Sequence, residues 1–122
     1  MNNENAIASL TQEIKNTLVG FIGSDEPGII TELVQIYQND TQALMESLHE
    51  AVANHDMKTI TSVTHTIKSS SGNLGANRLA ELASSLEKLS KAGDITAVSA
   101  QLAQIEAEYK LVCLALKRLL VQ

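Results

Sequence analysis

The chain has 122 residues, enough to bury one hydrophobic core, and we expect a single domain that spans residues 1–122. Aromatic residues make up only 2% of the chain, which contains 6 glycines and 1 proline; this argues against a many-stranded β fold and predicts helices with an aliphatic core. The net charge of -5 argues against nucleic acids and anionic membrane surfaces as partners. No apolar run approaches the roughly 20 residues of a membrane-spanning helix, and the N-terminus does not resemble a signal peptide, so we expect a cytoplasmic protein.

The first two expected helices cover residues 5–19 and 27–54, where apolar residues recur at three- and four-residue steps. Between them, SDEPG supplies capping residues and a proline near a helix start. The side chains expected to face the core are Ile7, Leu10, Ile14 and Leu18 in the first helix, and Ile29, Leu33, Ile36, Tyr37, Leu44, Leu48 and Val52 in the second.

Three further helices are expected after the NHD break, which contains His55 and a suitable N-cap, Asp56. They cover residues 57–72 and 76–91, followed by a helix that Asp94 caps. The expected core residues are Ile60, Val63, Ile67 and Leu74, then Leu79, Leu82, Leu86 and Leu89, and finally Ile95, Val98, Leu102, Ile105, Tyr109, Val112, Leu116 and Leu119.

Together these stripes predict an all-α protein, an antiparallel four-helix bundle with up-down-up-down topology and a short extra N-terminal helix across one end. The stripe of the last helix also resembles a coiled-coil seam, which leaves dimerisation along it as an alternative. Short loops and four comparable stripes favour a bundle packed on itself, and we expect a monomer.

The third expected helix carries an unusual polar face around His65. At about 100° per residue, His65 falls roughly 180° from the apolar stripe, on the same side as Thr61, Lys68, Ser69 and Gly72. Serines and glycine have low helix propensity, whereas an ordinary solvated face carries long Glu, Lys and Arg side chains. Small residues leave the imidazole prominent and give another backbone room to approach. A histidine that merely faces water is the alternative, but this loss of helix propensity favours a functional site.

The side chains on this face are suited to accepting a phosphoryl group. A histidine with an ordinary pKa near 6.5 is largely neutral at cytoplasmic pH, so it offers a nitrogen nucleophile. Lys68, three residues on, lies on the same side of the helix and would pair with phosphoryl oxygens carried on the ring.

The run HTIKSSSGNLGA from His65, followed by Leu86 and Glu87, resembles the signature of histidine-containing phosphotransfer (HPt) domains, roughly H-x-L-K-G-S-S-x-x-L-G-A. The resemblance implies that His65 is phosphorylated on Nε2 and that Lys68 steadies the phosphoryl group. It also implies a hydrogen bond from Nδ1 of His65 to Glu87. The alternative is that Glu87 is one more solvated glutamate. The small positions beside the histidine match Ser69, Ser70, Ser71 and Gly72; Ser69 departs from the usual glycine, which bears on the choice of partner.

By this resemblance the protein is a phosphorelay intermediate of two-component signalling. His65 would accept a phosphoryl group from a receiver-domain aspartate and pass it to another receiver, between a hybrid sensor kinase and a response regulator. The chain would be a carrier with no cofactor of its own, because Mg²⁺ and catalysis belong to the receiver. The alternative function is a helical adaptor that binds a partner through the same face without phosphorylation.

Other chemistry has weaker support in the sequence. Glu46 and His49 have the Glu-x-x-His spacing of bundle di-metal sites, but no second copy exists, and we expect no metal. No glycine-rich phosphate loop is present, which argues against a nucleotide-hydrolysing enzyme.

Overall fold

A computed structural model describes residues 3–121, and this part of the chain consists of five helices and their connections. The helices are α1 (Asn3–Ile22), α2 (Pro27–Ala53), α3 (Met57–Leu74), α4 (Asn77–Lys91) and α5 (Ile95–Leu120). The expected all-α class is confirmed. Within residues 3–121, no helix is both long and apolar enough to cross a membrane.

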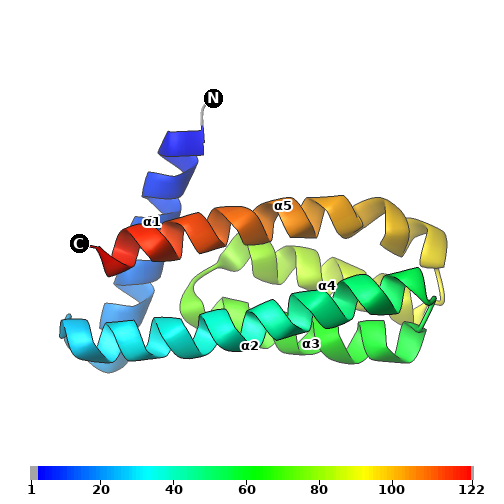
Figure 1. Ribbon diagram of the computed structural model, residues 1–122, viewed down its shortest axis with the longest axis horizontal. Helices are drawn as coiled ribbons and strands as arrows, with labels where there is room; N and C mark the ends of the chain where they lie inside the picture. Colours follow the sequence, from blue (N-terminus) through cyan, green and yellow to red (C-terminus); the bar gives the residue numbers. More distant parts are fainter. Residues whose placement is uncertain (1–2, 122) are drawn as a thin grey trace.

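Helices α2 to α5 lie side by side along the long axis of the molecule, and α1 crosses them near the end that holds the C-terminus (Figure 1). Each of these four helices packs against the next, and α5 also contacts α2. Helix α1 packs mainly against α5, with a smaller contact to α3.

The expectation of a short first helix is wrong. Helix α1 has 20 residues, more than the 18 of α3 and the 15 of α4. It continues through Gly20, where a break was expected, because a single glycine weakens a helix without ending it. It ends instead at Gly23, which has a φ of +83° and donates its backbone N–H to the carbonyl of Val19 at 2.8 Å.

Side-chain caps fix the starts of α3 and α5, as the sequence predicted. The Asp56 carboxylate accepts from the backbone N–H of Thr59 at 3.1 Å, and Asp94 accepts from Ala97 at 3.0 Å. Helix α3 ends two residues later than expected, because the turn closes around Gly75. Asp56 and Gly75 therefore set where α3, and with it the polar face around His65, begins and ends.

The expected stripes of α3, α4 and α5 face the core, although Leu82, Leu89, Ile95, Leu102 and Tyr109 are only partly buried against it. The inward face of α2 differs from the prediction. Ile29 and Ile36 are 38% and 51% exposed, so their assignment to the core is wrong. The buried stripe of α2 consists of Ile30, Val34, Tyr37, Thr41, Met45, Leu48, Ala51 and Val52. Helix α2 has a second apolar edge beside this stripe, and periodicity alone does not tell which edge meets the bundle.

Gly75 is required both by its backbone conformation and by the close approach of α1. Its φ of +94° lies in the left-handed region, and a Cβ there would lie 2.8 Å from Cβ of Thr17 and 3.3 Å from the carbonyl oxygen of Glu13. The absence of a side chain at position 75 therefore lets the end of α3 pack closely against α1.

We expect Gly75→Ala to lower the free energy of unfolding by about 2–4 kcal/mol, the sum of left-handed strain and overpacking. Gly93→Ala is the matched control, since Gly93 has a φ of +75° but open space around its Cα. That control should lose only the strain, about 1–2 kcal/mol. Urea unfolding measures both; equal losses would contradict the close packing of α1 on Gly75.

Candidate phosphotransfer site

His65 lies midway along α3 with its side chain directed to solvent, as the helical wheel predicted. The side chain is 61% exposed, while Ile60, Val63 and Ile67 on the opposite side of α3 are buried. The helix is therefore anchored by its apolar side and presents the imidazole on its other side.

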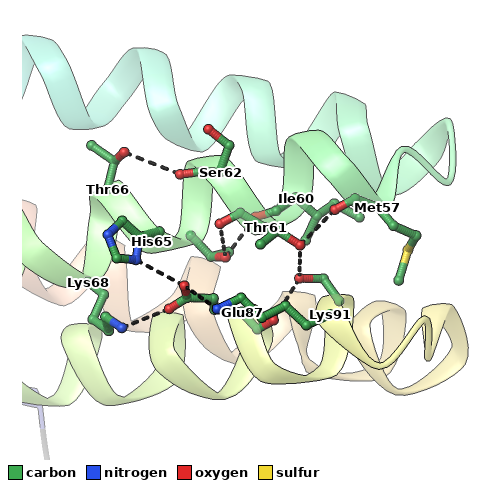
Figure 2. A network of polar contacts seen from close by, with 11 residues as sticks. Met57, Ile60, Thr61, Ser62, His65, Thr66, Lys68, Glu87 and Lys91 are labelled. Atoms are coloured by element: carbon green, nitrogen blue, oxygen red, sulfur yellow. Dashed lines mark hydrogen bonds and ion pairs between the residues drawn. The ribbon is translucent and has the colours of Figure 1, made fainter.

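Glu87 of α4 holds one ring nitrogen of this histidine. Its Oε2 lies 2.9 Å from Nδ1 of His65, and Figure 2 shows the other ring nitrogen pointing away from the carboxylate. An ionised carboxylate only accepts hydrogen bonds, so Nδ1 must carry the proton and donate. In the neutral ring the lone pair is then on Nε2, on the exposed side.

Two lysines keep the Glu87 carboxylate ionised. Lys68 Nζ lies 2.8 Å from Oε1, and Lys91 Nζ lies 3.3 Å from Oε2 (Figure 2). The hydrogen bond from Lys68 is the main cause that lowers the pKa of Glu87 to about 2; burial opposes it, and the bonds from His65 and Lys91 assist it. The Glu87 side chain is only 7% exposed, so Glu87 is not an ordinary solvated surface residue.

Lys91 was not singled out by sequence reasoning. It follows Glu87 by four residues on α4, a spacing that brings two helix side chains together. Once Glu87 was a candidate site residue, this spacing could have identified Lys91 as its partner.

Thr61 and Ser90 connect α3 and α4 beside this cluster. Their hydroxyls lie 2.7 Å apart, and either can donate. The Thr61 hydroxyl also lies 2.9 Å from the carbonyl oxygen of Met57, and that of Ser90 lies 2.8 Å from the carbonyl of Glu87. Thr61 is half-buried, so its hydroxyl links the two helices that carry His65 and Glu87.

The small residues after His65 fall into two groups. Ser69 and Gly72 are exposed, and Ser70 is half-buried with its hydroxyl donating to the carbonyl of Thr66 at 3.0 Å. Ser71 is fully buried, and its hydroxyl lies 2.9 Å from that of Tyr37 on α2. The exposed face therefore includes Ser69, Ser70 and Gly72, whereas Ser71 ties α3 to α2.

An apolar groove lies beside this face, between α1, α2 and α3. Its lining residues are Leu18, Phe21, Leu33, Ile36, Tyr37, Asp40, Thr41, Ser70, Asn73 and Leu74. Phe21 is 82% exposed and Ile36 is 51% exposed. Sequence reasoning missed this groove because it assigned Ile36 to the core and ended the first helix before Phe21.

The other two histidines lie outside the cluster around Glu87. Nδ1 of His49 on α2 lies 3.0 Å from Oε2 of Glu106 on α5. His55 lies in the connection after α2 with a φ of +54°. Within residues 3–121, no three His, Cys, Asp or Glu side chains are grouped so that they could hold a metal ion.

Comparisons with known proteins agree with this geometry. Residues 32–115 match the family model of the Hpt domain, so the chain belongs to the histidine-containing phosphotransfer family and the expectation from the His65 motif is confirmed. Among solved structures, the chain is similar to histidine-containing phosphotransfer protein B from Pseudomonas aeruginosa PAO1, with 25% identity and a TM-score of 0.71. The match covers 86% of this chain and 88% of that one. No curated protein matches the sequence.

The family and the structural match together support a role in two-component signalling. The chain is a phosphorelay protein for histidine phosphotransfer, and its family works with receiver domains. This agrees with the function that the motif predicted.

Proposed function

We propose that His65 is the residue that carries the phosphoryl group, and that the chain shuttles it from the receiver domain of a hybrid sensor kinase to that of a response regulator. The observation that carries this proposal is the bond between Nδ1 of His65 and buried Glu87, which leaves Nε2 as the exposed nucleophile. His49 has a carboxylate partner too, but that glutamate is 38% exposed and has no lysine beside it in the ion pairs of residues 3–121.

The transfer is an exchange of one bond to phosphorus. The lone pair on Nε2 attacks the phosphorus of the receiver's aspartyl phosphate, an N–P bond forms, and the P–O bond to the aspartate breaks as its carboxylate leaves. The ring takes up positive charge, which Glu87 stabilises through the proton on Nδ1. In the onward step an aspartate oxygen of the next receiver attacks the phosphorus, a P–O bond forms, and the N–P bond breaks with its electron pair returning to Nε2. The ring leaves as neutral imidazole because Nδ1 is still protonated.

The chain contributes position and charge, and the receiver is proposed to contribute catalysis. Mg²⁺ bound to the partner receiver would neutralise phosphoryl oxygens during transfer. Lys68 is proposed to pair with those oxygens once they are on Nε2. The chain itself is then a carrier without a cofactor of its own.

The exposed face of α3 and the neighbouring groove are proposed as the receiver-docking surface. Ser69, Ser70 and Gly72 keep side-chain bulk low beside His65, so a receiver backbone can approach. The groove adds apolar contact area, and Thr61 supports the α3–α4 side of the face. The serine at position 69 adds a Cβ and a hydroxyl where the family usually has glycine, and is proposed to affect which receiver fits.

We expect Ile36→Asp to weaken binding of the cognate receiver by about tenfold or more, since a charge in an apolar contact must be desolvated. Ile36 is half-exposed, so the fold should tolerate the change. Leu114→Asp is the matched control: Leu114 is 45% exposed and lies on α5, outside the groove. Titration calorimetry with the receiver measures both; equal affinities would contradict docking in the groove.

We also propose that the protein is a monomer and works in the cytoplasm, where the ATP that supplies a phosphorelay is available. Val98, Ile105, Val112 and Leu116 on α5 are fully buried inside the chain's own bundle. These apolar side chains, which a dimer along α5 would use, therefore already pack against the other helices of the same chain.

The test of the proposed function is phosphoryl transfer itself. Purified protein is mixed with a phosphorylated receiver and Mg²⁺, and the label on the protein is tested with acid and alkali. Acid-labile, alkali-stable label is expected for phosphohistidine. Receiver binding without any label would favour the adaptor function instead.

A further inference from the structure

Lys91 is a second cation on Glu87, and it reaches that carboxylate from the same helix. Its Nζ lies 3.3 Å from Oε2, the oxygen that also accepts from Nδ1 of His65, whereas Lys68 binds the other oxygen from α3. The Lys91 side chain is 62% exposed, and its only ion pair among the described residues is with Glu87. Nothing in the phosphotransfer chemistry above uses it.

The two lysines differ in what happens to them when His65 is phosphorylated. A phosphoryl group adds between about 1.5 and 2 negative charges at neutral pH. Lys68 lies on the helix of His65, one turn further on, and is the cation drawn to these charges. When Lys68 turns from Glu87 to the phosphoryl group, Oε1 of Glu87 loses its hydrogen-bond donor. A buried carboxylate without a cation is strongly unfavourable.

We propose that Lys91 is a positioning residue that keeps the Glu87 carboxylate on Nδ1 of His65 while Lys68 is engaged by the phosphoryl group. The inference rests on the proposed function of His65. The Lys91–Glu87 pair lies within one turn of α4, so it does not depend on where Lys68 points. Glu87 then remains ionised and in place in both states of the carrier.

The consequence concerns the onward transfer. With Glu87 held on Nδ1, the phosphorylated ring keeps the Nδ1 proton and leaves as neutral imidazole when the N–P bond breaks and the receiver aspartate takes the phosphoryl group. Without that proton the ring would leave as imidazolate, a much poorer leaving group. Lys91 would thus act on the rate of donation through Glu87, without contacting the phosphoryl group.

The first test needs no phosphorylation, because Lys68→Met imitates the state in which Lys68 has turned away. At a pH where the ring is neutral, ¹⁵N NMR should show the Nδ1–H tautomer of His65 in wild type and in Lys68→Met. The double variant Lys68→Met/Lys91→Met should show mixed tautomers. Lys68→Met/Lys88→Met is the matched control, because Lys88 is exposed on α4 and has no ion pair with Glu87. Retention of the single tautomer in the first double variant would overturn the inference.

The second test measures donation from phosphorylated His65 to a receiver. Lys91→Met should slow this step roughly three- to tenfold, Lys88→Met should leave it unchanged, and Lys91→Arg should restore it. Equal rates for Lys91→Met and wild type would overturn the inference even if wild type is labelled normally. A wild type that takes no label, with mixed tautomers in the first double variant, would instead refute the proposed function and leave the role of Lys91 in holding Glu87 standing.

Discussion

His65→Gln should take no phosphoryl label from any phosphorylated receiver that labels the wild type. Glutamine is similar in length and polarity but has no nucleophilic nitrogen, so the N–P bond cannot form. The side chain is 61% exposed, and we expect the substitution to change the free energy of unfolding by less than about 0.5 kcal/mol, as is usual at the surface. The readout is acid-labile label on the gel-purified protein, with circular dichroism to show that the bundle is intact.

The controls for this loss are the two remaining histidines. His49→Gln and His55→Gln remove an imidazole from α2 and from the following connection, away from Glu87. Both should label at the wild-type level. If His65→Gln is labelled as well as wild type, His65 does not carry the phosphoryl group.

Substitution of Glu87 should have the second largest effect on transfer. Glu87→Leu removes the acceptor for Nδ1, so the ring loses its fixed tautomer and orientation. We expect transfer to slow by roughly 10- to 100-fold, the range seen for residues that orient a metal-bound histidine. Glu87→Gln keeps a carbonyl oxygen that can accept from Nδ1, and should lose much less. Stopped-flow or quench-flow transfer rates distinguish the two; equal losses would show that the charge matters and the hydrogen bond does not.

The same residue predicts a dependence of stability on pH. The pKa of Glu87 is lowered from 4.5 to about 2 in the folded protein, chiefly by the hydrogen bond from Lys68. Because the folded pKa is the lower one, the stabilisation is fully present above pH 4.5 and is lost as pH falls toward 2. Urea unfolding at several pH values should show that Glu87→Gln removes this part of the acid dependence.

The sequence was informative where local physics decides the outcome. The N-caps at Asp56 and Asp94 and the exposed side of α3 follow from hydrogen bonding and helical periodicity within a few residues. The His65 motif could be recognised because its histidine, lysine and small residues occupy fixed positions in one short run.

Features that depend on contacts between helices were not predictable in the same way. Helix α2 has two apolar edges, and only its packing against α3 and α5 decides that Ile30 is buried while Ile29 and Ile36 are exposed. The bond between Ser71 and Tyr37 joins residues that are 34 positions apart. Lys91 acquires its role only after Glu87 is known to be buried beside His65.

The attachment point of the phosphoryl group is the central claim, and NMR of the phosphorylated protein tests it most directly. Spectra that combine ³¹P and ¹⁵N on uniformly labelled protein should show phosphorus bonded to Nε2 of His65, with a proton on Nδ1. This result follows from the 2.9 Å contact between Nδ1 and Glu87. Phosphorus on Nδ1 of His65, or on His49 or His55, would contradict the account.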